Sequence, residues 1–236
     1  MNKLEVCFSP ALYTFFENRD AVVVVTDVLR ATSAIVTAFM NGVERIIPVG
    51  SQEEAKAYKE QGFLVAAERD GIVLDFADFG NSPFNFNRER VEGSHVVYST
   101  TNGTNAIHLA SSAREVLIGA YLNLRSLTEY VAGSNSDLII LCAGWKNKFN
   151  LEDTLFAGAL AKGVLQEGNH TTICDSAIGA IDLYDLARDN MMSYIDKVAQ
   201  RERLRKNGLD DVIGYCHAID QTHVIPVLRE NYLTVL

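Results

Sequence analysis

Asp27 and Glu68 each end a run of apolar residues that is typical of a β-strand, and Asp153 opens the helix predicted after the apolar run 138–142. In open α/β sheets, ligands bind beyond the carboxyl ends of the strands, so functional acids are expected at these positions. Carboxylate oxygens are also the ligands that Mg²⁺ prefers in proteins. The three acids therefore predict a magnesium site with catalytic acids, and Arg30 is expected beside it to bind an oxyanion through two parallel hydrogen bonds.

Each of these acids also has a purely structural interpretation. Asp27 is suited to cap the helix that follows it. Glu152 and Asp153 lie in a predicted first helical turn, where acidic side chains complement the helix dipole. Cys142 ends the preceding strand, and we expect it to fill space in the core because no histidine partner can be assigned to it.

A turn rich in hydroxyl groups, residues 99–104, lies between a predicted strand and a predicted helix. Free backbone N–H groups and the positive end of the helix dipole at such a turn favour the binding of a phosphate. Asn81-Ser82-Pro83 adds further neutral donors, although an Asx-type turn is its structural alternative. The predicted substrate-binding residues are Arg30, Arg69, Asn81, Ser82, Ser99, Thr100, Thr101, Asn102, Gly103 and Thr104.

Apolar, β-branched runs alternate with segments of helical length along most of the chain. Strands are predicted at 22–25, 45–49, 63–67, 96–99, 115–118 and 138–142, and helices at 31–40, 52–61, 102–110, 122–132 and 151–165. Hydrophobicity within the strands is continuous, which indicates that both faces of the sheet are covered. The sequence therefore predicts an α/β fold with predominantly parallel sheets flanked by helices.

Two regions depart from this alternation. Residues 71–92 form a turn-rich segment that is too long for a simple connection, and we interpret it as a functional lobe or lid. From about residue 177 the chain is predicted to be mainly helical, with a solvated basic helix face at 196–206 and a last strand at 223–228. We expect one domain over residues 1–236, built as two closely packed lobes at about 1–92 and 93–236.

Composition limits the classes of function. The chain has 236 residues, a net charge of −9 and a pI of about 5.0, which argues against nucleic acid as a partner. Its apolar stretches fall short of the ~20 residues that span a bilayer, and residues 1–5 lack the pattern of an export signal, so we expect a cytoplasmic protein without a membrane partner. Four widely separated cysteines predict reduced thiols. A homodimer is one candidate assembly.

Taken together, several blocks of this chain resemble the 2-phosphosulfolactate phosphatase family, and their order and spacing match over most of its length. The blocks are Asp27-Val28-Leu29-Arg30-Ala31-Thr32, Glu68-Arg69, Phe79-Gly80-Asn81-Ser82-Pro83, Ser99-Thr100-Thr101-Asn102-Gly103-Thr104, Asn123-Leu124, Cys142-Ala143-Gly144 and Leu151-Glu152-Asp153-Thr154. The resemblance implies a Mg²⁺-dependent enzyme that hydrolyses 2-phosphosulfolactate to sulfolactate and phosphate during coenzyme M synthesis. It places the family's acidic blocks on Asp27, Glu68 and Asp153.

The chain departs from the family pattern at two places. Asp70-Gly71 stands where paired glycines are usual, and Trp145-Lys146-Asn147-Lys148-Phe149 follows Gly144 where a second glycine is common. We expect the first change to alter the approach of the backbone to the ligand. The second is expected to bring an aromatic ring and two cations near the site, so the identity of the substrate is left more open than the fold.

Several alternatives stay open at this point. The substrate could be another phosphorylated 2-hydroxy acid, and the protein could be a non-catalytic sensor of an anionic metabolite, although three acids would hinder anion binding unless they held a metal. An aspartyl-phosphate on Asp27 is a further route, but Leu29 occupies the second acid position of the D-x-D motif that haloacid-dehalogenase-type phosphatases use. Candidate cations for the sulfonate and carboxylate of the substrate are Arg69, Arg125, Lys146 and Lys148.

Overall fold

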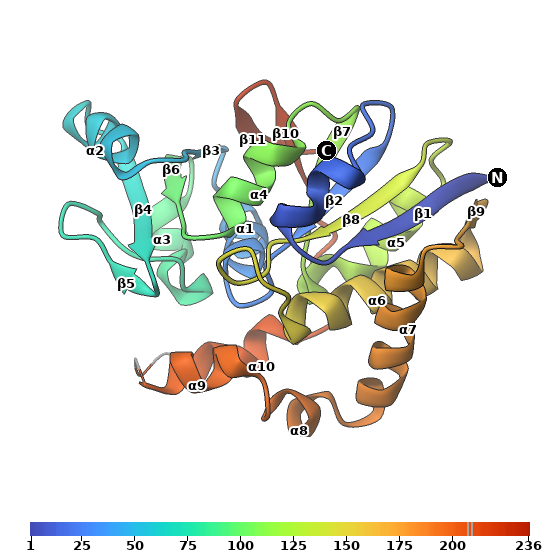
Figure 1. Cartoon of the computed structure of the whole chain (residues 1–236). Coiled ribbons are helices and arrows are strands. Elements are labelled where there is room, and N and C mark those ends of the chain that lie inside the picture. Colours follow the sequence, from blue (N-terminus) through green and yellow to red (C-terminus); the bar gives the residue numbers. More distant parts are fainter. Residues whose placement is uncertain (207, 209) are drawn as a thin grey trace.

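The computed structural model describes residues 1–206, 208 and 210–236. Within these residues eleven strands form one sheet in the order β5-β4-β6-β3-β11-β10-β7-β2-β8-β1-β9 (Figure 1). The strands are β1 (Asn2–Cys7), β2 (Val22–Thr26), β3 (Arg45–Pro48), β4 (Leu64–Arg69), β5 (Ile72–Val73), β6 (His95–Ser99), β7 (Glu115–Gly119), β8 (Leu138–Cys142), β9 (His170–Thr171), β10 (Pro226–Arg229) and β11 (Tyr232–Val235).

The sheet consists of two parallel parts. β7, β2, β8, β1 and β9 are parallel neighbours in one part, and β3, β6 and β4 are parallel neighbours in the other. The predicted α/β fold with a mostly parallel sheet is therefore confirmed. Pairing crosses residue 92 in both directions, since β2 lies between β7 and β8 while β6 lies between β3 and β4. The organisation into one domain with two lobes stays a prediction.

An antiparallel hairpin joins the two parallel parts. β10 pairs with β7 through Val227 and Leu117, and β11 pairs with β3 through Leu233 and Ile46. The predicted strand at 223–228 begins only at Pro226, and β1 and β11 were not predicted at all. β10 and β11 have four residues each next to a turn and give a weak periodic signal, whereas β1 has six residues, and the alternation of its Leu4 and Val6 with polar residues was overlooked.

The twist of the sheet brings the two parts to one site. β4 and β2 are six strand pairings apart in the sheet. Because three of these pairings, around the β10–β11 hairpin, are antiparallel, the two strands would point in opposite directions in a flat sheet. A right-handed sheet turns by about 20–25° at each step, so six steps turn it by roughly 120–150°. The carboxyl ends of β4 and β2 therefore converge even though the pairing alone would send them to opposite edges.

Helices cover both faces of the sheet, as the continuous hydrophobicity of the strands predicts. The α-helices are α1 (Ala31–Met40), α2 (Gln52–Glu60), α3 (Arg88–Val91), α4 (Gly103–Ala110), α5 (Leu124–Ala132), α6 (Leu151–Glu167), α7 (Asp175–Ala187), α8 (Met191–Ile195), α9 (Ala199–Lys206) and α10 (Ile213–Cys216). Short 3₁₀ helices lie at η1 (Pro10–Phe15), η2 (Pro83–Asn85), η3 (Tyr121–Asn123), η4 (Arg188–Asn190) and η5 (Asp210–Val212).

β2 shows how one strand serves two cores. Val22 and Val24 pack into the core formed with α5, α6 and α7, whereas Val23 and Val25 pack into the core formed with α1 and α4. All four valines are at most 3% exposed, so the strand contributes apolar area on both faces. A third, smaller core lies under α2.

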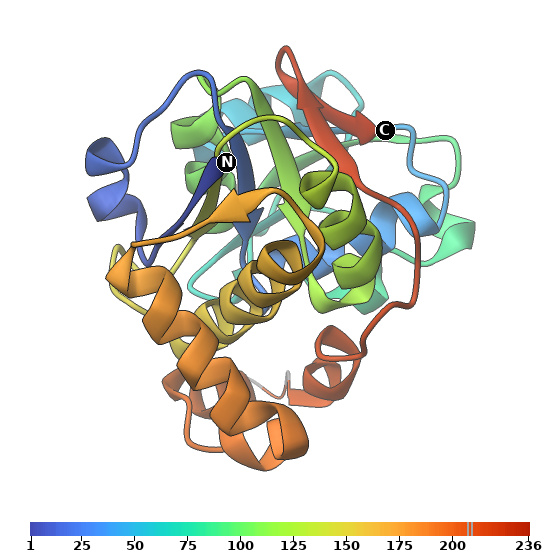
Figure 2. The same ribbon diagram turned by 90° about the vertical axis from the view of Figure 1, so that its right-hand side faces the viewer.

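The C-terminal part is mainly helical, as predicted. Helices α7 to α10 lie along the bottom of the molecule in Figures 1 and 2, below α6, and only the β10–β11 hairpin returns to the sheet. Segment 71–92 forms β5, η2 and α3 between β4 and β6. Among the helices in the described ranges, none combines the length and apolar character needed to cross a bilayer.

Candidate active site

A small cavity lies where the converging strand ends meet, and we call it the central cavity. It has a volume of about 20 Å³, which is room for about one water molecule. Five of the predicted site residues line it: Asp27, Arg30, Glu68, Asn81 and Asn102. Leu29, Gly71, Trp145 and Gln200 complete its wall. Residues that are up to 173 positions apart in the chain thus form one polar hollow.

Asp27 is a buried acid of the central cavity. It follows β2 and is 7% exposed, and its Oδ1 accepts a weak hydrogen bond of 3.3 Å from the Ala31 backbone N–H at the start of α1. Burial raises the pKa of Asp27 well above its ordinary value, and the nearby charges of Asp153 and Glu68 raise it further. Asp27 is therefore not the N-cap residue of α1, which is Arg30, but it contacts the first N–H of the helix and lines the cavity.

Arg30 and Asn81 present polar groups to the same cavity without protein partners. Arg30 is 4% exposed, and among the residues that the structure describes its guanidinium forms no hydrogen bond and has no carboxylate within 4.0 Å. The buried Oδ1 of Asn81 likewise has no hydrogen-bond partner in the described ranges. Because buried polar groups are costly when they are unsatisfied, both side chains indicate a ligand between them.

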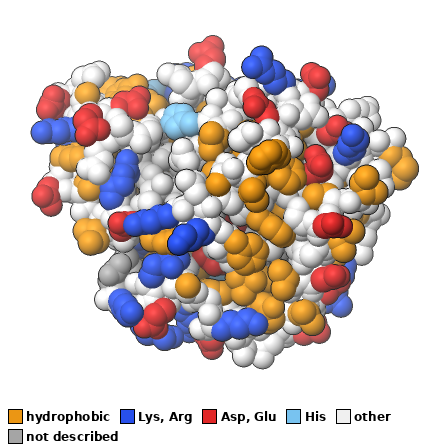
Figure 3. Space-filling model, in the orientation of Figure 1, with side chains coloured by type: hydrophobic (Ala, Val, Ile, Leu, Met, Phe, Trp, Pro, Cys, Tyr) orange, Lys and Arg blue, Asp and Glu red, His pale blue; other side chains and the backbone are white. Residues whose placement is uncertain are grey.

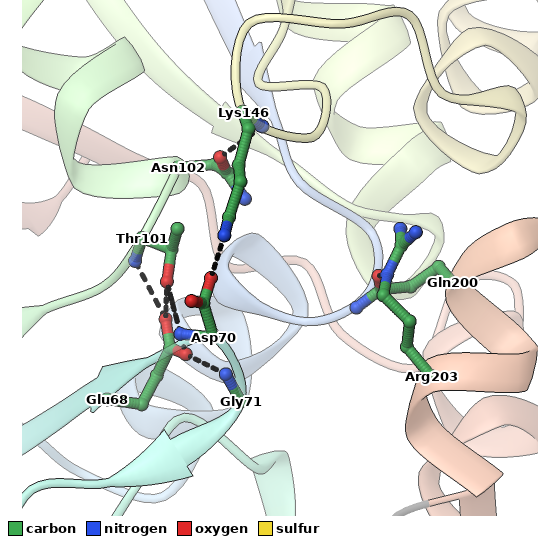
Figure 4. A network of polar contacts seen from close by, with 8 residues as sticks. All are labelled: Glu68, Asp70, Gly71, Thr101, Asn102, Lys146, Gln200 and Arg203. Carbon is green, nitrogen blue, oxygen red and sulfur yellow. Dashed lines mark hydrogen bonds and ion pairs between the residues drawn. The ribbon is translucent and has the colours of Figure 1, made fainter. Parts of the chain in front are cut away.

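Glu68 is held by backbone and hydroxyl donors (Figure 4). Its Oε1 accepts from the Thr101 N–H at 2.7 Å and its Oε2 accepts from the Gly71 N–H at 2.6 Å, while the Thr101 hydroxyl donates to the same carboxylate. These bonds fix the orientation of the carboxylate at the cavity wall. They also tie the turn after β4 to the turn after β6.

Asp153 lies behind the cavity rather than on its wall. It is fully buried at the start of α6, where its Oδ1 accepts from the Val28 N–H at 2.8 Å and its Oδ2 accepts from the Gly144 N–H and the Asn150 amide, both at 3.0 Å. Burial and the charge of Glu152 raise the pKa of Asp153 to about 8. The side chain positions the loops that follow β2 and β8, and its role as a metal ligand stays a prediction.

Most hydroxyls of the 99–104 turn satisfy partners within the protein. Thr100 and Thr104 exchange backbone and hydroxyl hydrogen bonds at the start of α4, and Ser99 accepts from the Arg69 guanidinium at 2.9 Å. Only Asn102 of this turn lines the central cavity. Gly103 packs so closely that a Cβ there would lie 2.5 Å from the Cβ of Ala31, so the turn holds α1 against α4.

A second cavity, of about 310 Å³, adjoins the central one and shares Arg30, Gly71 and Asn81 with it. The predicted substrate-binding residue Ser82 lines this second cavity. Segment 71–92 therefore contributes two of the predicted site residues, while its motion as a lid stays a prediction.

Gln200 is the site residue that sequence analysis missed. It projects from α9 toward the strand ends (Figure 4), is 9% exposed, and donates from Nε2 to the Leu29 carbonyl at 3.2 Å. The expectation that 196–206 is a solvated helix face is therefore wrong for Gln200 and for the buried Leu204. The only available signal was that these two uncharged residues stand four apart in a charged helix.

The two segments that depart from the family pattern, Asp70-Gly71 and 145–149, contact each other. Asp70 and Lys146 form an ion pair of 2.8 Å across the mouth of the site, with both side chains about half exposed (Figure 4). The Lys146 N–H also donates to Asn102 at 2.9 Å. An exposed pair of this kind contributes little stability, typically about 0–1 kcal/mol, so a ligand could readily displace it.

The other candidate cations are distributed unevenly. Arg69 donates to Ser99 and to the Glu68 carbonyl. Lys148 lines a third cavity, described below, whereas Arg125 lies on α5 in an ion pair with Glu129 and lines a separate hollow with Asp220. Arg125 is thus the one candidate that the fold does not bring near the central cavity.

Cys142 is fully buried, and burial raises its pKa well above the ordinary value, in agreement with a packing role.

The donors of the central cavity suit a hard divalent cation. Within the described ranges, no cluster of three or more His, Cys, Asp or Glu side chains has the geometry of a metal centre. The oxygens at hand are mixed instead, with carboxylates from Asp27 and Glu68 and the unpartnered amide oxygen of Asn81. Oxygen-only sets with open positions for water and phosphate are typical of Mg²⁺ sites, and a cation would favour the charged form of Asp27.

Comparison with known proteins gives a consistent result. The sequence model described as 2-phosphosulpholactate phosphatase matches residues 7–231. Probable 2-phosphosulfolactate phosphatases from Clostridium novyi and Thermotoga maritima are each 36% identical, over 219 residues (92% of both chains) and 217 residues (90% of both chains). One from Caldanaerobacter subterraneus is 35% identical over 213 residues, 89% of this chain and 88% of the relative. The chain therefore belongs to the 2-phosphosulfolactate phosphatase family.

Proposed function

We propose that this protein hydrolyses the phosphate ester of 2-phosphosulfolactate to sulfolactate and inorganic phosphate, as a Mg²⁺-dependent enzyme. The observation that carries the proposal is that Asp27 and Arg30, a buried acid and a buried cation, line one cavity without forming an ion pair with each other. Family membership adds the substrate. A role in coenzyme M synthesis in the cytoplasm is part of the same proposal.

Asp27, Glu68 and the amide oxygen of Asn81 would hold the metal ion, while Asp153 fixes the loops around it. When bound, Mg²⁺ withdraws charge from a phosphoryl oxygen and lowers the pKa of water. Glu68 is suited to its part because the backbone N–H groups of Gly71 and Thr101 already orient its carboxylate. Asp27 is suited because its Oδ2 accepts no hydrogen bond from the described residues.

Arg30 would stabilise the transferring phosphoryl group. Its guanidinium is held in the cavity without an ion-pair partner among the described residues, so its N–H groups are available to the oxygens on which charge develops. The reaction adds water to phosphorus and breaks the ester P–O bond, and the alkoxide oxygen that leaves takes up a proton, from the attacking water or through solvent, to become the hydroxyl of sulfolactate. Asn102, Trp145 and Gln200 line the cavity wall and limit access of other water molecules.

Phosphate release tests the proposal directly. Protein treated with a chelator should release phosphate from 2-phosphosulfolactate only after Mg²⁺ is added back. Arg30→Ala removes a preorganised donor and should lower kcat by about 100- to 1000-fold, and Asp27→Asn should abolish the Mg²⁺ dependence together with activity. Arg125→Ala is the matched control, because this arginine lies away from the cavity.

Three outcomes would contradict different parts of the proposal. Release from another phosphorylated 2-hydroxy acid alone would change the substrate. Release that a chelator does not affect would remove the metal. Binding without release from any of these esters would favour a sensor of an anionic metabolite.

A further inference from the structure

A third cavity, of about 520 Å³, adjoins the central cavity, and we call it the Arg203 cavity. It shares Trp145 and Gln200 with the central cavity, and Lys148, Lys197 and Arg203 line it. The two cavities therefore share a wall at Trp145 and Gln200, so a ligand group in the Arg203 cavity would lie next to the central cavity.

The Arg203 cavity is locally cationic on an acidic protein. Its three basic residues face one acidic residue, Glu152, although the whole chain carries a net charge of −9. Across the described residues, no carboxylate lies within 4.0 Å of the charged nitrogens of Lys148, Lys197 or Arg203. Lysine and arginine side chains gather left of centre on the face in Figure 3. Such a field favours an anionic ligand.

Arg203 is held in place before any ligand binds. Its Nε donates to Oε1 of Gln200 at 2.7 Å, and its guanidinium lies 4.2 Å from the ring centre of Trp145. Gln200 is in turn bound to the Leu29 carbonyl, next to Arg30. These contacts leave the two terminal nitrogens of Arg203 for a ligand, with a fixed position relative to the reacting centre.

The second cavity offers a weaker site for an anion. Its charged lining residues are Arg30 and Asp211, one of each sign, and Arg30 is already assigned to the phosphoryl group. A second anionic group of the substrate in this cavity would lie near Asp211, with no cation other than Arg30 among the described lining residues. The charges of the two cavities therefore favour the Arg203 cavity for the part of the substrate that carries no phosphate.

We propose that the Arg203 cavity binds the sulfonate of the substrate, and that Arg203 determines specificity for it. This inference rests on the proposed function, because the sulfonate distinguishes 2-phosphosulfolactate from simpler phosphorylated hydroxy acids. The two terminal guanidinium nitrogens of Arg203 and the ammonium group of Lys148 are donors of this cavity, and the three oxygens of a sulfonate can accept from them.

The test compares two substrates, 2-phosphosulfolactate and 2-phospholactate, which carries hydrogen in place of the sulfonate. Arg203→Met should lower kcat/KM for 2-phosphosulfolactate by about 10- to 100-fold, the loss of a charge-assisted hydrogen bond. It should change kcat/KM for 2-phospholactate by less than about threefold. Arg205→Met is the matched control, because Arg205 is about half exposed on the same helix and pairs with Glu202.

Equal losses for both substrates would overturn the inference, since they indicate a structural role for Arg203. An unchanged preference would overturn it as well. Lys148→Met provides a second variant if Arg203→Met does not fold, because Lys148 is exposed, and it should show the same selective loss.

Binding of the product separates this inference from the proposed function. Calorimetry with sulfolactate needs no turnover, and affinity should fall about 10-fold or more in Arg203→Met but not in Arg205→Met. If wild-type protein releases phosphate from neither ester, the proposed function fails, while selective binding of sulfolactate would still support the cavity. Equal affinity in all three proteins would overturn the cavity assignment whatever the phosphatase assay shows.

Discussion

At the scale of single residues, the site concentrates acidic groups that are difficult to ionise in the absence of a cation. Burial raises the pKa of Asp153 to about 8 and that of Glu152 to about 7, and it raises the pKa of Asp27 well above the ordinary value. The three side chains also raise one another's pKa, so each carboxylate that ionises makes the next ionisation less favourable.

These shifts predict how the stability of the metal-free protein depends on pH. Between the ordinary pKa of a carboxyl, near 4, and about 8, the folded state binds more protons than the unfolded state, so the free energy of unfolding should fall as pH rises. Thermal melts in chelator at pH 5, 6, 7 and 8 should give a decreasing Tm. Asp153→Asn should reduce the slope because an amide does not titrate, and added Mg²⁺ should raise Tm most at pH 8. A Tm that rises across this range would contradict the prediction.

Much of the central cavity could be predicted from residue types at strand ends. Asp27, Arg30, Glu68 and Asn102 were predicted because parallel α/β sheets place polar side chains after buried strands. Gln200 was not, because nothing local distinguishes a glutamine that reaches a distant carbonyl from one that faces solvent. The partners of Asp153 were equally hidden, since its hydrogen bonds to the backbone of residues 28 and 144 depend on tertiary contacts.

At the scale of elements, α6 and α7 approach so closely that side-chain size decides their fit. A Cβ on Gly158 of α6 would lie 2.0 Å from the Ala180 carbonyl oxygen of α7. Helix propensity alone would favour alanine there. The contact with α7 wins because backbone atoms cannot move aside as a flexible side chain would. The start of α6 carries Glu152 and Asp153, so this contact also positions the site.

The two helices offer a matched pair of substitutions. Gly158→Ala should lower the free energy of unfolding by about 1–3 kcal/mol, because the helices must separate to admit the methyl group. Gly179→Ala on α7 meets nothing within 4 Å and should raise stability by about 0.5–1 kcal/mol through helix propensity. Urea unfolding measures both changes. Similar effects of the two substitutions would show that the close approach of α6 and α7 does not limit stability.

At the scale of the whole molecule, the active site depends on the joining of two parallel sheet parts. Glu68 lies near the end of β4 in one part, and Asp27 comes directly after β2 in the other part. The alternation of strands and helices predicted both parts. It could not predict the β10–β11 hairpin between them, because a pattern of apolar residues does not reveal pairing partners so far apart in the chain. The convergence of the acids was therefore predicted, whereas its cause, the twist across an antiparallel hairpin, was not.

Leu233 on β11 tests whether this hairpin holds the two parts together. Its side chain is fully buried and its backbone pairs with Ile46 of β3. Leu233→Ala should lower the free energy of unfolding by about 2–5 kcal/mol, because it leaves a cavity at the junction. Val235→Ala is the control on the same strand, where 42% exposure predicts a loss below about 1 kcal/mol.

Urea unfolding should be followed by circular dichroism and by the fluorescence of Trp145, the single tryptophan, which lines the central cavity. In Leu233→Ala both signals should shift to lower urea, since loss of the junction separates the residues that Trp145 contacts from those after β4. A fluorescence midpoint that stays at the wild-type value, while circular dichroism shifts, would show that the cavity keeps its structure without the hairpin. Other contacts would then join the two parts, such as the packing of Gly103 against Ala31, the Asp70–Lys146 ion pair and the hydrogen bond that the Lys146 N–H donates to Asn102.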